Sequence, residues 1–303
     1  MQICVVIVSY NSEHVIESCL ASLMTQKISK IIIVDNASQD QTVAKVSQSF
    51  PQIEIIKLAQ NTGYGGGNNI GIRIALKHGT DYVLVLNPDT ILEKDCLKKL
   101  LFHAEAHVQS RILGPKIYQA ESHTVENKDE KVLWSVGGVL DKKRYTAGLV
   151  GLGEKDVGQF DQNSKVDFIS GTCMLIPRKV FDTGIKFYEP YFLYYEDVEF
   201  CRMASLLGFP SYIVPDAKII HFETSENKHK SLNSLKKNRN LKNYYLARNH
   251  LLFVERNAPF GVQLRETIRL PKTLLDHFKK GDGEAIEGIK DYFLRRFSAP
   301  TPA

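Results

Sequence analysis

The stretch Leu84-Val85-Leu86-Asn87-Pro88-Asp89-Thr90 decides the expected fold, because an apolar run ends there in a proline turn that carries one carboxylate. A short apolar run bounded by turn residues is typical of a buried strand. Ligands of open α/β sheets bind beyond the carboxyl ends of the strands. A carboxylate in that place is therefore better explained by a ligand or a cation than by folding, and the turn indicates phosphate or sugar chemistry.

The chain around this turn alternates between short apolar runs and helix-length amphipathic stretches, which predicts βαβ units and a parallel sheet. The expected strands are 3–8, 31–34, 53–58 and 82–86, and the expected helices are 13–24, 41–49 and 69–77. From 111 to 176 the extended pieces become shorter and are punctuated by glycine, as in mixed or antiparallel strands. The region 195–207 predicts a helix that ends at Gly208.

Composition places the chain among ordinary globular proteins. Its 303 residues are 43% hydrophobic and 24% charged, enough to bury a substantial core. The formal net charge of +5 is mild, and we expect no nucleic-acid partner. The five cysteines lack metal-ligand spacing and predict reduced thiols in a cytosolic protein. The first apolar run stops at Ser9, too early for a signal peptide or a membrane span, so we expect a cytoplasmic protein.

The C-terminal part is basic and has helical spacing. Between Ser225 and Arg256 eight Lys or Arg residues stand against two acids. Two interpretations stay open: a solvated helix face, or a basic amphipathic helix that rests on anionic headgroups through Tyr244, Tyr245 and Phe253. The second would place the protein peripherally on the inner face of the cell membrane.

Polar residues follow the other expected strands at the same edge of the sheet. The first strand ends in Ser9-Tyr10-Asn11, without the glycine fingerprint of dinucleotide-binding proteins, so hydride transfer is disfavoured. The second strand ends in Asp35, an acid suited to accept hydrogen bonds from a ribose or a base. The glycine-rich turn 61–69 follows the third strand, and its glycines would let the backbone approach a flat ligand.

Six ordered motifs resemble the family 2 glycosyltransferases of the GT-A fold, in particular their bacterial rhamnosyltransferase-like members. The motifs are Val8-Ser9-Tyr10-Asn11, Ile33-Val34-Asp35-Asn36-Ala37-Ser38, Asn61-Thr62-Gly63 with Asn69-Ile70-Gly71, Leu86-Asn87-Pro88-Asp89, Ser170-Gly171, and Tyr194-Tyr195-Glu196-Asp197-Val198-Glu199. The resemblance implies an α/β fold with a Rossmann-like mixed sheet flanked by helices. It implies a GT-A domain at 1–225, with a nucleotide-binding half at 1–110 and an acceptor-side half at 111–225, and a basic helical extension at 226–303.

The resemblance also implies the reaction. A sugar, for which rhamnose is a candidate, would pass with inversion from a dTDP- or UDP-linked donor to a hydroxyl of a glycan or polyprenyl-linked acceptor. The product would be a cell-surface polysaccharide or its lipid-linked precursor. Mg²⁺ or Mn²⁺ would assist, since a hard cation neutralises a departing diphosphate. A second copy of the chain is a further candidate partner, as a homodimer.

The roles of individual residues follow from the same resemblance. The nucleotide would be bound by Ser9, Tyr10, Asn11, Asp35, Asn61, Gly65, Asn69 and Asn87. Asp89 and His221 would hold the metal. Asp197 would be the catalytic base with Glu196 beside it, because one-step inversion needs a carboxylate that takes the acceptor proton, and crowded carboxylates raise one another's proton affinity.

Each of these acids has a structural alternative. Asp35 could serve as a turn residue or helix cap, and Asp89 could cap a helix that begins near Glu93. Glu196 and Asp197 could simply meet the dipole at a helix start. Two other functions stay open: a sugar-phosphate nucleotidyltransferase, and a catalytically inactive subunit that binds a nucleotide sugar. The presence of Asp89, Glu196 and Asp197 together favours an active transferase.

Overall fold

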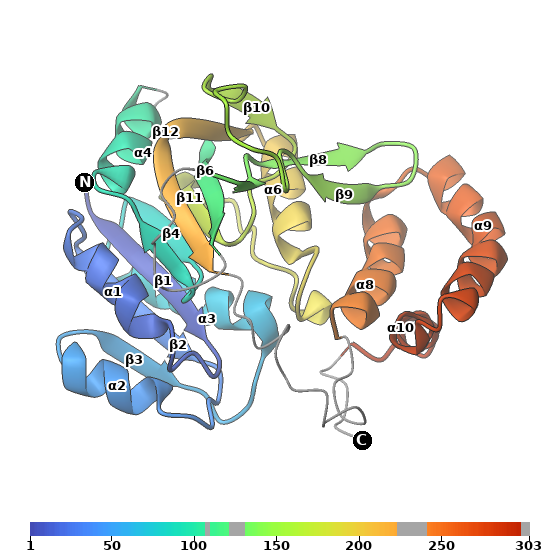
Figure 1. The fold of residues 1–303 in the computed structure, drawn as a ribbon, viewed down its shortest axis with the longest axis horizontal. Helices are drawn as coiled ribbons and strands as arrows, with labels where there is room; N and C mark the ends of the chain where they lie inside the picture. The colour runs from blue at the N-terminus through green and yellow to red at the C-terminus, as the bar shows by residue number, and fades with distance from the viewer. Residues whose placement is uncertain (107–109, 121–130, 223–240, 298–303) are drawn as a thin grey trace.

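The computed structural model describes residues 1–106, 110–120, 131–222 and 241–297 (Figure 1). Its centre is a ten-stranded mixed sheet of order β10-β12-β6-β11-β4-β1-β2-β3, in which β5 pairs with β12 and β7 with β6. The strands are β1 (Ile3–Ser9), β2 (Lys30–Asp35), β3 (Glu54–Lys57), β4 (Tyr82–Leu86), β5 (Thr90–Leu92), β6 (Ile112–Ala120), β7 (Leu133–Ser135), β10 (Ser164–Val166), β11 (Cys173–Pro177) and β12 (Ser211–Phe222). A separate hairpin is formed by β8 (Gly138–Asp141) and β9 (Thr146–Leu149).

Helices cover both faces of the sheet, as the expected α/β architecture requires. The described helices are α1 (Ile16–Met24), α2 (Thr42–Ser49), α3 (Gly63–Lys77), α4 (Cys96–Glu105), α5 (Arg178–Asp182), the 3₁₀ turn η1 (Glu189–Tyr191), α6 (Glu196–Leu206), α8 (Leu241–Asn257), α9 (Phe260–Lys279) and α10 (Gly283–Phe293), and the last three lie beside the sheet. The alternation of side chains along β1 explains the two layers. Val6 points into the core beneath α3 and α6, whereas its neighbour Val5 points into the core beneath α1, α2 and α4.

The strand order creates a switch point beside β1. The chain runs from β1 to β2 and β3 on one side, and β4 then pairs with β1 on the other side, all four in parallel. Ser9 and Asp35 are register partners at the ends of β1 and β2. The edge formed by the carboxyl ends of β1, β2 and β4 is called the rim below, and it is where open α/β sheets bind ligands.

Several expectations for the rest of the chain are confirmed. The strands at 3–8, 31–34 and 82–86 form as expected, and α6 ends before Gly208, whose φ is +89°. All five cysteines are buried free thiols. After α6 the chain forms one long strand, β12, whose pairing with β6 has a register shift between Val214 and Lys218.

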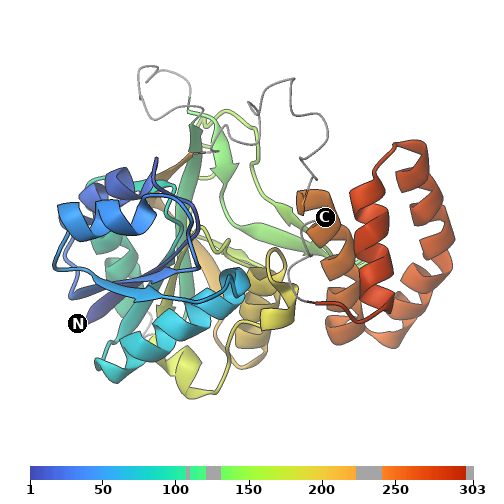
Figure 2. The same cartoon turned by 90° about the horizontal axis from the view of Figure 1, so that it is seen from below.

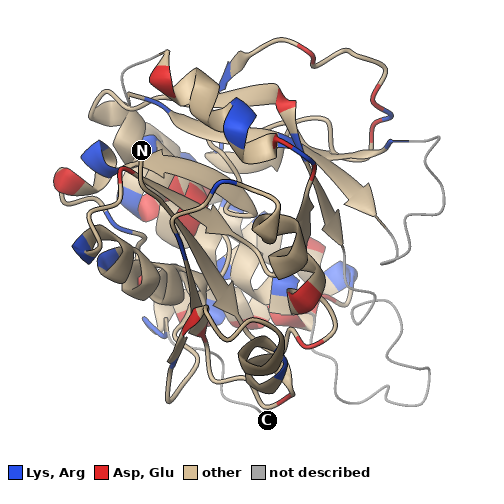
Figure 3. Cartoon of the chain, turned by 90° about the vertical axis from the view of Figure 1, so that its left-hand side faces the viewer, with Lys and Arg blue, Asp and Glu red and all other residues tan. Residues whose placement is uncertain are grey.

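The C-terminal helices α8, α9 and α10 stand beside the sheet rather than on it (Figure 2). None of the described helices is both long and apolar enough to cross a bilayer. The expected domain boundary at Ser225, and the basic residues between it and residue 240, lie outside the described residues. On the side of the molecule that carries α1, α2 and α4, basic and acidic residues are interspersed (Figure 3).

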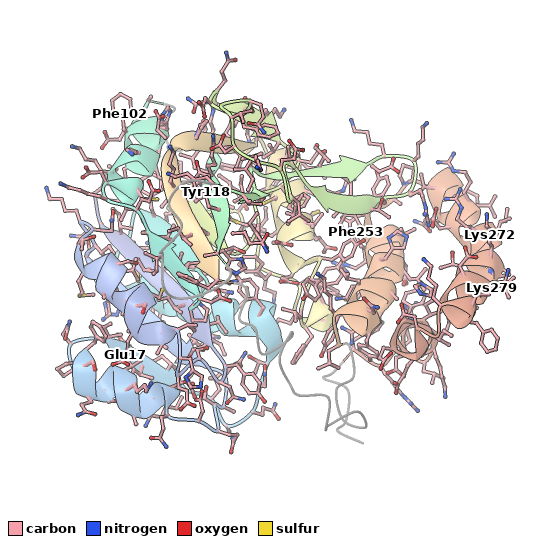
Figure 4. All side chains as sticks on the ribbon, in the orientation of Figure 1. Glu17, Phe102, Tyr118, Phe253, Lys272 and Lys279 are labelled. Atoms are coloured by element: carbon pink, nitrogen blue, oxygen red, sulfur yellow. The ribbon has the colours of Figure 1, made fainter. Side chains whose placement is uncertain are left out.

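The membrane interpretation of the basic segment is wrong for the three aromatic residues of α8. Tyr244, Tyr245 and Phe253 are each at most 2% exposed, so they cannot rest on headgroups. Phe253, labelled on α8 in Figure 4, packs against the rings of Tyr145 and Tyr195. Arg248 is fully buried and belongs to no solvated face, whereas Lys242 and Arg256 are exposed, and Arg256 also pairs with Glu199. Tyrosine, phenylalanine and arginine at helical spacing here mark the packed side of the helix.

Candidate active site

Asp35 lies at the rim with its carboxylate fully engaged. Its Oδ1 accepts hydrogen bonds from Ser9 Oγ (3.3 Å) and Ser38 Oγ (2.6 Å), and its Oδ2 accepts one from the Ser38 amide (3.1 Å). The interpretation as a helix cap is wrong, because α2 begins only at Thr42, whereas the role of a turn residue is confirmed. Asp35 is a buried, fixed anion at the end of β2.

The loop after β1 is tied to the loop after β2. The Asn11 amide donates to Ser38 Oγ (2.9 Å), and Asn11 Oδ1 accepts from the Gln39 amide (2.8 Å). Asn11 has a φ of +50°, which an asparagine tolerates better than most residues. Tyr10 is 51% exposed on this loop. The rim therefore carries a fixed acid at the end of β2, and the loop after β1 carries an exposed ring.

Asn36 was missed as a site residue, although it follows Asp35 directly. Its Nδ2 donates to the Gly63 carbonyl (3.0 Å), and its Oδ1 accepts from the amide and the hydroxyl of Thr62 (2.9 and 3.1 Å). Asn61 Oδ1 accepts from the Gly63 amide (2.8 Å) and closes the same turn. Asn36 thus fixes the start of α3 against the rim. Its position directly after the expected site acid Asp35 is the feature of the sequence that could have identified it.

The expected glycine-rich turn is a helix, since α3 begins at Gly63 and includes Gly65. A Cβ on Gly65 would stand 3.2 Å from Phe187 Cβ, and one on Gly67 would stand 2.7 Å from Val8 Cγ1. Glycine is favoured at these positions because α3 packs closely on β1 and on the segment before α6. Both glycines are buried and serve the packing of α3. The role of Gly65 in nucleotide binding stays a prediction.

Asn69 also faces the segment before α6. Its Nδ2 donates to the Phe187 carbonyl (2.8 Å) and to Glu189 Oε1 (3.0 Å), while its Oδ1 accepts from the Phe187 amide (3.0 Å). Both ends of the amide are engaged, so a contact to a base would have to replace one of these hydrogen bonds.

Asp89 and His221 meet at the rim from different parts of the chain. Strand β5 pairs with β12 and sets Thr90 opposite His221, which brings His221 Nε2 to 3.2 Å from Asp89 Oδ1. The two atoms are close but not aligned as a hydrogen bond, and both Asp89 Oδ1 and His221 Nδ1 are buried without a hydrogen-bond partner. The helix-cap interpretation of Asp89 is wrong, because β5 intervenes and α4 begins at Cys96.

The turn after β4 is connected to the acids of α6 through main-chain hydrogen bonds. The Asn87 amide donates to the Thr172 carbonyl (3.0 Å), and the neighbouring Gly171 amide donates to Asp197 Oδ2 (3.0 Å). Tyr64 OH, from α3, donates to the Gly171 carbonyl (2.5 Å). The candidate metal turn and the candidate base therefore share one rigid support.

Glu196 and Asp197 differ in their hydrogen bonds. Burial, and next the charge of Asp197, raise the pKa of Glu196 well above its usual range, and Glu196 Oε2 has no hydrogen-bond partner. Burial also raises the pKa of Asp197, but the amides of Gly171 and Val198 donate to it and oppose the rise. The protonated form is therefore favoured more strongly at Glu196 than at Asp197, whose two amide donors favour its charged form.

Glu199, the last acid of the motif, is structural. It accepts hydrogen bonds from Arg256 (2.7 to 3.1 Å), from Asn257 Nδ2 (2.7 Å) and from Tyr191 OH (2.5 Å). Arg256 also lies over the Tyr188 ring, 3.4 Å from its centroid. This network fastens α6 to the C-terminal end of α8.

A sheet of this order, with its acids gathered at the switch point, is that of a GT-A glycosyltransferase. The chain belongs to glycosyl transferase family 2, whose family model matches residues 4–184. The match ends before Glu196, so it covers the rim as far as Asp89 but not the acids of α6.

Named relatives agree with this class. The chain is 24% identical to the dTDP-rhamnosyl transferase RfbF of Shigella flexneri over 297 residues, 94% of each chain. It is 26% identical to N-acetylglucosaminyl-diphospho-decaprenol L-rhamnosyltransferase of Mycobacterium tuberculosis, over 72% of this chain and 75% of that one. It is 30% identical to the low-salt glycan biosynthesis hexosyltransferase Agl10 of Haloferax volcanii over 66% of this chain, and spans 60% of that protein.

Solved structures share the fold at low identity. S. aureus TarS 1-349 in complex with UDP aligns with a TM-score of 0.54 and 19% identity, over 92% of this chain and 72% of that chain. GalNAc-T7 with UDP, GalNAc and Mn²⁺ aligns with a TM-score of 0.62 and 13% identity, over 84% of this chain and 48% of that chain. These likenesses establish the fold.

Proposed function

We propose that this protein transfers a sugar, with inversion, from a nucleoside diphosphate donor to a hydroxyl of a glycan or lipid-linked acceptor in cell-surface polysaccharide synthesis. Rhamnose from a dTDP-linked donor is the first candidate, because RfbF, which aligns over nearly the whole chain, is named for that sugar and nucleotide. The observation that carries the proposal is the Glu196–Asp197 pair, because the Gly171 amide that holds Asp197 (3.0 Å) lies next to Thr172, which the turn after β4 contacts through the Asn87 amide (3.0 Å). A nucleotidyltransferase or an inactive binding subunit is not favoured by these relatives.

The donor would lie along the rim. Asp35 would accept hydrogen bonds from the base or ribose, and the exposed Tyr10 would cover the flat ring. Asn61 and Asn87 flank the path toward the diphosphate. Within the described residues the Asn87 side chain makes no hydrogen bond, so its amide remains available to the donor.

The residues at Asp89 fit a divalent cation. An unpaired, buried carboxylate oxygen beside an imidazole is costly unless a ligand or cation completes it. No third Asp, Glu, His or Cys joins them among the described residues, so the diphosphate and water would complete the coordination, as is usual for Mg²⁺. A bound Mg²⁺ or Mn²⁺ would neutralise charge on the leaving diphosphate. The GalNAc-T7 structure holds UDP with Mn²⁺.

Asp197 would act as the base. As the acceptor oxygen attacks the anomeric carbon, its proton passes to Asp197 and the bond from that carbon to the diphosphate oxygen breaks. The Gly171 amide holds Asp197 Oδ2 in place (3.0 Å). Protonated Glu196 keeps a second negative charge out of the same buried space, which would otherwise repel the anionic donor.

A peripheral membrane location is supported by α9 rather than α8. Its exposed apolar side chains are Phe260 (78%), Leu264 (49%), Ile268 (72%), Leu275 (50%) and Phe278 (74%). Arg265, Lys272 and Lys279 follow one another at intervals of seven residues and so lie along one side of the helix, with Asp276 as its exposed acid. Figure 4 shows Lys272 and Lys279 on the side that faces away from the sheet. An apolar stripe flanked by bases suits an anionic bilayer surface.

Vesicle sedimentation tests this surface. The protein should sediment with phosphatidylcholine vesicles that contain phosphatidylglycerol, and high salt should release it. Phe278→Ser should weaken that binding, whereas Phe102→Ser, which alters an equally exposed phenylalanine on α4 (70%), should not. Equal losses in both variants, or equal binding to neutral vesicles, would overturn the membrane proposal. A dimer seen in ultracentrifugation and broken by Phe278→Ser would assign the face to a second copy instead.

Calorimetric titration tests the donor site. UDP, dTDP and GDP are each titrated with and without Mn²⁺ into the protein and into Asp89→Ala. We expect selective binding of one nucleotide, strengthened by Mn²⁺ in the wild type only. No binding of any nucleotide by folded protein would overturn the proposed function.

A further inference from the structure

The segment that leads into α6 has a costly backbone. Phe192 (φ +64°, ψ −56°), Tyr194 (φ +68°) and Tyr195 (φ +76°) all have positive φ, although none is a glycine. Phe192 is the centre of a tight turn in which the Leu193 amide donates to the Tyr191 carbonyl (2.7 Å). Such conformations persist only when surrounding groups hold them.

The groups that hold this segment come from α8. Asn249 Nδ2 lies within hydrogen-bond distance of three carbonyls, those of Tyr191 (2.9 Å), Leu193 (2.7 Å) and Tyr194 (2.9 Å). Arg248 Nη2 donates to the same Tyr191 carbonyl (2.7 Å). Three donors, two of them from α8, therefore converge on the carbonyl at the strained turn.

Arg248 also sets the direction of the Asn249 amide. Its Nε donates to Asn249 Oδ1 (3.0 Å), which leaves the Asn249 NH₂ pointing at the segment. Both side chains are fully buried. From the opposite side, the Tyr64 amide at the start of α3 donates to the Phe192 carbonyl (2.7 Å). The segment is thus held between the helix that begins at the rim and the C-terminal region.

We infer that Arg248 and Asn249 are positioning residues for transfer: they hold residues 190–195 in the strained conformation that sets the place of Asp197. They touch neither substrate nor Asp197 and act through the main chain. The inference rests on the proposed role of Asp197 as base. It makes the C-terminal helix α8 part of the active site rather than an appendage.

Asn249→Ala tests the inference, with Asn243→Ala as the matched control on the same helix, because Asn243 Nδ2 donates to Asp282 (3.1 Å) and not to this segment. Asn249→Ala should lower kcat by about 100-fold, the effect expected when a reacting group is misplaced by about 1 Å. The KM for the donor should stay within about twofold, since the rim is untouched. Hydrogen exchange of amides 191–197 should become faster in this variant alone.

Unchanged exchange at 191–197 in folded Asn249→Ala, or equal losses of kcat in both variants, would overturn the inference. Should Asn249→Ala not fold, Arg248→Lys removes the planar fork but keeps the charge, and the same shifts in kcat and exchange are expected. If the wild type transfers no sugar, the proposed function fails, whereas the exchange measurement still decides whether α8 holds the segment.

Discussion

The two ends of the site differ in how their polar atoms are satisfied. At Asp35 and Asn36 every side-chain oxygen accepts a hydrogen bond from within the chain. At Asp89, His221 and Glu196, by contrast, one buried polar atom each has no hydrogen-bond partner. The first end is satisfied within the fold, whereas at the second a bound ligand or cation would supply the missing partners.

This difference has an energetic basis. A buried polar atom without a partner costs about 1–3 kcal/mol, so three of them close to one rim are a substantial burden for a marginally stable protein. Pairs such as Glu199 with Arg256 show that this fold does neutralise buried acids where only stability matters. The atoms without a hydrogen-bond partner at Asp89, His221 and Glu196 are therefore where we propose that the cation and the acceptor interact.

Removal of the base should have the largest effect. Asp197→Asn should lower kcat by about 10³-fold, within the range of a lost general base, while nucleotide binding is retained. Release of nucleoside diphosphate in the presence of acceptor measures kcat, and calorimetry measures binding. Asp182→Asn, an exposed acid on α5, is the control. Turnover retained in Asp197→Asn would contradict the assignment.

The candidate metal ligand should have the next largest effect. His221→Phe keeps a ring against Trp134, whose centroid lies 4.5 Å away, but removes both nitrogens. Mn²⁺-assisted nucleotide binding should weaken by about tenfold, or about 1.4 kcal/mol, while binding without Mn²⁺ stays the same. Calorimetry with and without the metal separates the two. An equal loss in both conditions would mean that His221 acts by packing.

A pair of asparagines sharpens the comparison. Asn36→Ala removes three buried hydrogen bonds and should lower the free energy of unfolding by about 2 kcal/mol. Asn87→Ala removes none from within the described residues, so stability should change by less than about 0.5 kcal/mol while donor binding weakens. Urea denaturation and calorimetry give both values. A large loss of stability in Asn87→Ala would mean that the Asn87 side chain, like that of Asn36, makes hydrogen bonds that stabilise the fold.

Local patterns predicted much of the sheet and the acids of the site. Strand ends could be read because apolar runs stop at polar residues, as at Asp35 and Asn87, and parallel strands bring such ends to one edge. The order of motifs added what spacing could not, since Asp197 and Asp89 lie far apart in the sequence. The C-terminal helices could be expected from their spacing.

What could not be predicted depends on contacts between distant residues. Glycines suit a loop as well as a helix that packs on Val8, and only the position of β1 decides between them. The spacing of Tyr244 and Tyr245 suits a helix face that rests on a membrane as well as one that packs against the rest of the protein. The carbonyls that Arg248 and Asn249 satisfy belong to a segment more than fifty residues earlier, which no local pattern reveals.

The last prediction concerns Glu196 and the dependence of stability on pH. Because burial raises its pKa in the fold above the unfolded value, protonated Glu196 favours folding at low pH, and this contribution is lost as pH rises through the folded pKa. Glu196→Gln cannot ionise, so its stability relative to wild type should increase with pH, by at most about 1.4 kcal/mol per pH unit. Thermal unfolding from pH 5 to 9 measures this, with the exposed Glu105→Gln as control. A constant difference in stability between Glu196→Gln and wild type across this range would mean that the pKa of Glu196 is not raised in the fold. The argument that Asp197 is the charged member of the pair would then fail.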